Sequence, residues 1–141
     1  MTAGPILTEE RRIAHSHGDI LHAMKASSAG FAGFGEAYFT TVLPGAVKGW
    51  KLHREMTLNL VVAAGRVRFV VVADEAAPQA FVLGPDSAHG RLTVPPGYWM
   101  AFQGLAAEPS LVLNLADIAH RSDETENRDL DAIAFAWNSP T

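Results

Sequence analysis

Hydrophobic and polar positions alternate along most of the chain in short runs. Alternation with a two-residue period, in segments rich in Val, Leu, Phe, Tyr and Thr, favours β-strands, and Gly, Pro or Asp at their ends favours turns. The predicted strands are Phe34–Val42, Val47–His53, Thr57–Ala64, Val67–Asp74, Gln79–Leu83, Arg91–Pro95, Tyr98–Gln103 and Ser110–Ala116. About eight short strands without a long helical pattern predict an all-β sandwich or barrel.

The two ends of the chain depart from this pattern. Residues 1–18 are predicted to form an irregular N-terminal arm, and residues 121–141 a tail that packs back on the body. Within the tail, Arg121–Asp131 is acidic and predicted as a loop or short helix, whereas Ile133–Trp137 is predicted as a last strand. Since no internal repeat or linker is visible, residues 1–141 are expected to form a single domain.

Composition narrows the class of protein. A chain of 141 residues, 48% hydrophobic and 18% charged, is expected to bury a core and to be globular. The absence of cysteine excludes disulfides and thiolate metal sites. The net charge of −4 argues against a nucleic-acid surface. No stretch near the N-terminus is apolar enough for a signal peptide or a membrane span, so we expect a cytoplasmic protein without membrane contact.

The densest group of titratable side chains lies on the predicted strand Val47–His53. Lys51 and His53 are two residues apart and therefore leave the same face of an extended strand. If that face lines a cavity, the two side chains form an acid/base pair; if it faces water, they belong to an ordinary polar edge. In the second case the opposite face, with Lys48, Trp50 and Leu52, is the buried one.

Several motifs, in order, resemble the dTDP-4-dehydrorhamnose 3,5-epimerase family of the cupin superfamily. They are Pro44–His53, the turn Ala63-Ala64-Gly65, Val67–Val70, Leu92–Trp99 and Asn114–Asp117. The resemblance extends from about Phe34 to Trp137. It implies a jelly-roll antiparallel β-barrel that forms a homodimer. It also implies, as substrate, a nucleotide-linked 4-keto-6-deoxy sugar of polysaccharide or deoxysugar biosynthesis, and no cofactor.

The chain differs from this family at the family's catalytic positions. Lys51 stands where the epimerases have their catalytic histidine, Leu58 stands about where they have a lysine, and Leu113 near their tyrosine. The related nucleotide-sugar 3,4-ketoisomerases have a His-x-His pair at Lys51 and His53. This comparison indicates His53 as the acid/base group and Lys51 as its partner or as a stabiliser of an enolate oxygen. Tyr38 is a further candidate proton donor if it faces the same cavity.

Metal-binding cupins offer a second comparison. Their ligands would fall at Lys51, His53, Leu58 and Met100, and only His53 can bind a metal. One imidazole does not replace a set of three or four ligands, so no metal is expected here.

Candidate substrate contacts lie on neighbouring strands. Cations suit a diphosphate, aromatic rings suit a base or sugar, and polar side chains in apolar strands need a partner. The candidates are Lys48, Asn59, Arg68, Arg91, Tyr98, Trp99, Asn114 and Asp117. For Tyr98 and Trp99 the alternative is core packing, and for Asn59 a main-chain partner. Asp117 either orients His53 or caps a turn.

Three functions are compatible with these residues. The first is a metal-independent epimerase or isomerase of a nucleotide-linked sugar. The second is a non-catalytic protein that binds such a sugar, because the positions of Lys51, Leu58 and Leu113 differ from the epimerase pattern. The third is a metal-dependent cupin that oxidises a small molecule, which would carry stoichiometric metal.

Overall fold

A computed structural model describes residues 4–141 of the chain. The strands and two short 3₁₀ helices are β1 (Ile6–Glu9), β2 (Arg12–Ile13), β3 (Ile20–Leu21), β4 (Glu36–Val42), β5 (Val47–His53), β6 (Leu58–Ala64), β7 (Val67–Val72), β8 (Gln79–Leu83), β9 (Gly90–Val94), β10 (Trp99–Gly104), β11 (Ser110–Ala116), η1 (Ser122–Glu124), β12 (Thr125–Asn127) and η2 (Leu130–Ala132). Each of the eight strands predicted between Phe34 and Ala116 is present, with ends that differ by two residues or fewer. No helix within residues 4–141 is long and apolar enough to span a membrane.

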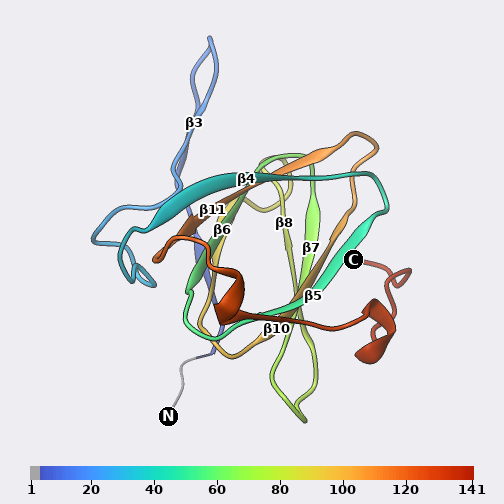
Figure 1. Cartoon of the computed structure of the whole chain (residues 1–141). Helices are drawn as coiled ribbons and strands as arrows, with labels where there is room; N and C mark the ends of the chain where they lie inside the picture. Colours follow the sequence, from blue (N-terminus) through green and yellow to red (C-terminus); the bar gives the residue numbers. More distant parts are fainter. Residues whose placement is uncertain (1–3) are drawn as a thin grey trace.

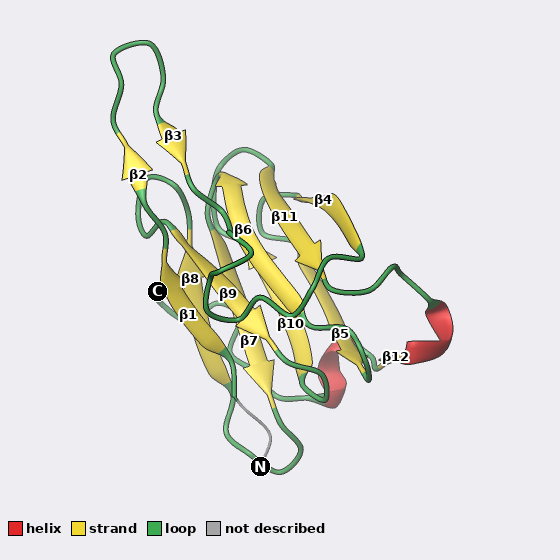
Figure 2. Ribbon diagram, turned by 90° about the vertical axis from the view of Figure 1, so that its left-hand side faces the viewer, coloured by secondary structure: helices red, strands yellow, loops and turns green. Residues whose placement is uncertain are grey.

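Two antiparallel sheets of five strands pack face to face (Figures 1 and 2). The first has the order β1-β9-β6-β11-β4 and the second the order β12-β5-β10-β7-β8. This arrangement confirms the predicted all-β jelly roll. The two sheets remain separate layers in their strand pairing, so β4 and β12 are edge strands.

The main core lies between the sheets. On β11, Val112 and Ala116 are buried, whereas Leu111, Leu113 and Leu115, which alternate with the buried positions, are partly exposed on the outer face. The same alternation on the other strands gathers one cluster of buried side chains: Val42, Met56, Leu58, Leu60, Val62, Val67, Phe69, Val71, Leu83, Leu92, Val94, Met100, Val112 and Ala116. Burial of these side chains holds the two layers together.

The C-terminal tail covers the outer face of the second sheet. Trp50 and Trp99 are buried there, and Phe135 and Trp137 pack against them. The tail packs back as predicted, but the strand expected at Ile133–Trp137 is wrong, because this segment has no strand pairing. The segment lies across a sheet face and packs its alternating apolar side chains there, and it does not add a strand to the sheet edge.

The N-terminal region is more regular than predicted. Strand β1 pairs with β9 at the edge of the first sheet, and β2 pairs with β3 to form a hairpin that projects from the body (Figure 2). His15 and His17 lie at the tip of this hairpin, with their ring centroids 5.5 Å apart.

Candidate active site

A cavity of about 290 Å³ lies between the two sheets, next to their edge strands β4 and β12. Its lining residues are Tyr38, Thr40, Lys48, Gly49, Lys51, His53, Leu58, Leu60, Met100, Phe102, Val112, Asn114, His120 and Asn127. Pockets for small ligands begin at about this size and combine an apolar wall with a few polar groups. The cavity therefore has the size and lining of a site for a sugar-sized ligand.

Lys51 and His53 both line this cavity, as the spacing on β5 predicts. Lys48 also lines it, although uninterrupted alternation places Lys48 on the opposite face. The reason is a β-bulge: Met100 lies opposite Lys51 and Phe102 opposite Lys48, so one residue of β10 faces two residues of β5. This bulge returns Lys48 to the cavity face and shifts the alternation by one residue.

Gly49 makes this bulge sterically possible. Its φ is 151°, and a Cβ atom at this position would collide with the Cβ and Cα atoms of Ala101 on β10. A residue with a side chain would have to push the two strands apart.

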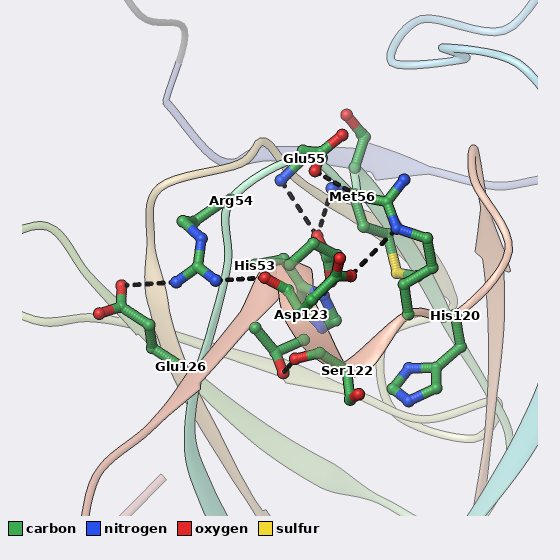
Figure 3. A network of polar contacts seen from close by, with 12 residues as sticks. His53, Arg54, Glu55, Met56, His120, Ser122, Asp123 and Glu126 are labelled. Carbon is green, nitrogen blue, oxygen red and sulfur yellow. Dashed lines mark hydrogen bonds and ion pairs between the residues drawn. The ribbon is translucent and has the colours of Figure 1, made fainter.

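His53 is paired with a buried carboxylate that the sequence pattern did not indicate. Its Nδ1 lies 2.5 Å from Oε2 of Glu124, which is 1% exposed. The other oxygen of Glu124 accepts hydrogen bonds from the main-chain N–H groups of Met56 (2.9 Å) and Glu55 (3.0 Å). Figure 3 shows this cluster, with His53, Glu55 and Met56 labelled.

The charge state of Glu124 fixes the tautomer of His53. Burial alone raises the pKa of Glu124, but the hydrogen bonds from His53, Met56 and Glu55 outweigh it and hold this pKa below its usual range. An ionised carboxylate only accepts hydrogen bonds, so Nδ1 of His53 carries the hydrogen. Nε2 is then the ring nitrogen that can accept a proton from a ligand in the cavity.

Tyr38 and Asn114 face the cavity from the first sheet. Nδ2 of Asn114 lies 3.0 Å from the hydroxyl oxygen of Tyr38, and the two residues are register partners on β11 and β4. Since His53 is on the second sheet, a ligand between the layers is approached from both sides.

Three polar lining residues and the thioether of Met100 were not predicted as site residues. The polar residues are Thr40, His120 and Asn127. Glu124, which lies behind His53, was not predicted either. His120 lies on the connection between the two sheets, where its main-chain N–H donates to Glu36 (2.8 Å). Asn127 lies opposite Lys51 on β12. For His120, Glu124 and Asn127, the only sequence signal was the polar segment after Asp117, which is typical of a solvated loop.

Two predicted substrate contacts form a buried cluster elsewhere. Arg91 is 0% exposed and donates to Glu10 (3.0 Å), Asn59 (2.5 Å) and Thr93 (2.9 Å), and to main-chain carbonyls of the segment before β4. Asn59 donates to the carbonyl of Gly30 (3.1 Å). Both side chains are occupied in holding the N-terminal segment, and neither lines the cavity.

The other predicted contacts outside the cavity also have internal partners. Arg68 donates to Ser139 in the tail, with distances of 3.1 Å to its hydroxyl and 2.6 Å to its carbonyl. Trp99 is in the outer cluster beneath the guanidinium of Arg128, and Tyr98 packs against the main core. Asp117 accepts from the N–H of Thr57 (2.7 Å), so Glu124 and not Asp117 orients His53.

No three His, Asp or Glu side chains among residues 4–141 gather in an arrangement that can hold a metal ion. At the positions that the metal-binding cupins use, Lys51, Leu58 and Met100 line the cavity beside His53. An ammonium, an aliphatic side chain and a thioether do not fit a cupin metal ion.

Solved structures provide the comparisons. A dTDP-sugar isomerase from Desulfovibrio desulfuricans G20 is 34% identical, with a TM-score of 0.91 over 98% of this chain and 93% of that one. A dTDP-4-dehydrorhamnose 3,5-epimerase from Bacillus anthracis, solved with TDP and PPi, has 17% identity and a TM-score of 0.82 over 97% of this chain and 86% of that one. The sugar 3,4-ketoisomerase QdtA from Thermoanaerobacterium thermosaccharolyticum, solved with TDP, has 16% identity and a TM-score of 0.76 over 94% of this chain and 93% of that one.

A scan of protein-family models gives no match, and neither does a search of curated protein sequences. The two more distant structures show the shared fold, whereas the isomerase is similar enough in sequence, over nearly all of both chains, to show the family. The family resemblance inferred from the sequence motifs is thereby confirmed. The chain belongs to the cupin family that contains this dTDP-sugar isomerase and the dTDP-4-dehydrorhamnose 3,5-epimerases.

Proposed function

We propose that the protein is a metal-independent epimerase or isomerase of a dTDP-linked 4-keto-6-deoxy sugar. The observation that carries this proposal is His53, held by a buried Glu124 and presented to a cavity of about 290 Å³. The similar isomerase and epimerases act on dTDP-linked sugars according to their names. Epimerisation and ketoisomerisation begin with the same step, removal of a proton from the carbon next to a ketone.

The proposed base is Nε2 of His53. A proton next to a ketone is acidic enough for an imidazole to remove when the enolate oxygen that forms is stabilised. Lys51 lies two residues away on the same face of β5 and supplies a positive charge for that oxygen. Glu124 stabilises the imidazolium that results, as a positioning residue that does not touch the substrate.

The charge of the cavity supports a nucleotide-linked substrate. Lys48 and Lys51 line it, and no Asp or Glu is among its lining residues. Nζ of Lys48 lies 5.9 Å from the ring centroid of Phe102. It also lies 3.5 Å from the carbonyl oxygen of Thr41 on β4, the edge strand of the first sheet. From there its ammonium can move to a diphosphate, and we assign Lys48 to that contact.

The homodimer and the cytoplasmic, biosynthetic setting belong to the same proposal. Phe39 on β4 is 62% exposed and Leu43 just after β4 is 59% exposed, beside partly exposed Leu113 on the next strand. Such an apolar patch on a sheet face is typical of a protein interface. Sedimentation of the wild type and of Phe39→Ser checks the dimer: we expect the substitution to shift the protein toward monomer.

Deuterium incorporation tests the reaction. In heavy water, the wild type with dTDP-4-keto-6-deoxyglucose is expected to exchange a ring proton next to the ketone, and His53→Ala to abolish this exchange. His17→Ala, an exposed histidine on the projecting hairpin, is the matched control and keeps full exchange.

Thermal shifts with the same compound separate catalysis from binding. A bound ligand stabilises the folded protein whether or not it reacts. Stabilisation without exchange, for this and other dTDP-linked ketosugars, would favour the non-catalytic binding protein. An absence of both would refute the proposal.

A further inference from the structure

The side-chain amide of Asn114 has only one possible orientation. Asn114 is 2% exposed, and one of its terminal atoms lies 3.1 Å from the main-chain nitrogen of Asn59. A main-chain N–H only donates a hydrogen bond, so the atom that faces it has to be the amide oxygen. The Nδ2 group of Asn114 therefore points the other way, toward Tyr38.

This orientation determines the direction of the Tyr38 hydroxyl. Nδ2 of Asn114 lies 3.0 Å from the hydroxyl oxygen of Tyr38, and an amide nitrogen only donates. The oxygen of Tyr38 is thus the acceptor, and its own hydrogen cannot lie on this contact. The other neighbour of Nδ2 is Sδ of Met56 at 3.9 Å, a weak acceptor that does not compete with the phenol.

We propose that Asn114 is a positioning residue that turns the hydroxyl proton of Tyr38 into the cavity, where Tyr38 acts as the proton donor. Asn114 is nearly inaccessible and its amide is engaged on both sides, so it serves Tyr38 and not the substrate. The inference deepens the proposed function and rests on it for the identity of the reaction.

The step is a proton transfer to the enolate that His53 generates. The O–H bond of Tyr38 breaks, and its proton forms the new bond to the enolate on the side of the first sheet. The negative charge moves to the phenolate oxygen, where Nδ2–H of Asn114 stabilises it. Exchange with water then returns a proton to Tyr38 and removes one from His53.

Raman spectroscopy tests the hydrogen bond without any substrate. The intensity ratio of the tyrosine Fermi doublet is high when the phenol oxygen accepts a hydrogen bond and low when the hydroxyl donates to a strong acceptor. The chain has two tyrosines, so a Tyr98→Phe background leaves Tyr38 alone in the spectrum. In that background we expect Asn114→Asp to lower the ratio, because the hydroxyl of Tyr38 would then donate a hydrogen bond to the carboxylate.

Two further variants complete the spectroscopic test. Asn114→Leu removes the donor without adding charge and should also lower the ratio, which keeps the test valid if Asn114→Asp does not fold. Asn127→Asp places the same new charge at another position of the cavity lining and should leave the ratio unchanged. An unchanged ratio in folded Asn114→Asp or Asn114→Leu would overturn the inference.

Kinetics with dTDP-4-keto-6-deoxyglucose provides the second readout. We expect Asn114→Asp to lower kcat by about 100-fold with KM unchanged, the magnitude of a lost general acid. In a Tyr38→Phe background the same substitution should have no further effect on kcat. Additive losses would overturn the inference, whereas a shifted Raman ratio without turnover by the wild type would refute only the proposed function.

Discussion

The pair of His53 and Glu124 differs in kind from the other ion pairs near the site. Its carboxylate is fully buried, whereas Arg54 and Glu126 form a pair at 3.5 Å with side chains that are about half exposed, at 46% and 52%. Exposed pairs contribute little to stability, but removal of one partner of a buried pair leaves the other without compensation. Substitutions two residues apart are therefore expected to have very different consequences.

Glu124→Gln should nearly abolish activity while the cavity keeps its shape. The amide nitrogen of glutamine would donate to Nδ1 of His53, which moves the ring hydrogen to Nε2 and removes the lone pair that faces the ligand. A tautomer change of this kind in a histidine–carboxylate pair costs about 10⁴-fold in the serine proteases, and we expect a loss of about 10²–10⁴-fold in kcat here. Steady-state kinetics is the measurement, and wild-type kcat in this variant would contradict the assigned role of Glu124.

The same residue predicts a pH dependence of stability. The pKa of Glu124 is held below its usual range. At pH values between the native and the unfolded pKa, the unfolded state therefore binds more protons than the native state, and stability falls as the pH falls. At neutral pH we expect the free energy of unfolding of the wild type to be about 1–3 kcal/mol larger than that of Glu124→Gln. This difference should shrink as the pH drops below about 4.3, the usual glutamate value.

Urea unfolding of both proteins at several pH values measures that difference. Glu126→Gln serves as the control, because its exposed carboxylate should change the free energy of unfolding by less than about 0.5 kcal/mol at every pH. A gap between wild type and Glu124→Gln that stays constant down to acid pH would be inconsistent with a depressed pKa.

At the scale of elements, β5 shows what the sequence could and could not predict. The shared face of Lys51 and His53 follows from strand alternation alone, and the structure places both in the cavity. Lys48 was assigned to the opposite face, because alternation assumes a strand without a bulge. Gly49 was the available signal, since glycine within a strand often marks a bulge or a close backbone approach.

Gly49→Ala should therefore destabilise the folded protein. The new Cβ atom would meet Ala101, and we expect a loss of about 2–4 kcal/mol in the free energy of unfolding. Gly97→Ala is the matched control: Gly97 also has a positive φ, of 93°, but no atom within 4 Å of the position of a Cβ. Its loss should be only about 1–2 kcal/mol, and equal losses in the two variants would show that contact with Ala101 is unimportant.

Long-range partners explain why several predicted site residues lie outside the cavity. Arg91 meets Glu10, which is 81 residues away in sequence, and His53 meets Glu124, which is 71 residues away. Periodicity reports which face of a strand a residue occupies but not what packs against that face. A buried arginine and a phosphate-binding arginine therefore look alike in sequence.

At the scale of the whole molecule, the tail joins the outer face of the second sheet to the cavity. The ring of Trp137 lies 5.8 Å from that of Trp50, whose Nε1 donates to the carbonyl of Leu130 (2.9 Å). Between these contacts and η1 lies β12, which carries Asn127 to the cavity and pairs with β5. The apolar spacing at the C-terminus predicted the packing, whereas its course across a sheet face depends on the tryptophans beneath it.

Trp137→Ala should loosen this arrangement. We expect a loss of about 2–4 kcal/mol in the free energy of unfolding, because a partly buried aromatic side chain leaves the cluster. Chemical denaturation measures it, with Phe34→Ala as a control whose side chain is 66% exposed and whose removal should change stability by less than about 0.5 kcal/mol. Equal effects would mean that the tail does not support the sheet.

The position of Glu124 in the chain has a consequence for synthesis. Every strand from β4 to β11 precedes residue 117, so a nascent chain that has emerged this far contains the strands that supply most of the cavity lining but lacks the partner of His53. A chain that stops before residue 124 therefore keeps His53 on β5 but lacks the carboxylate that fixes the tautomer of its imidazole.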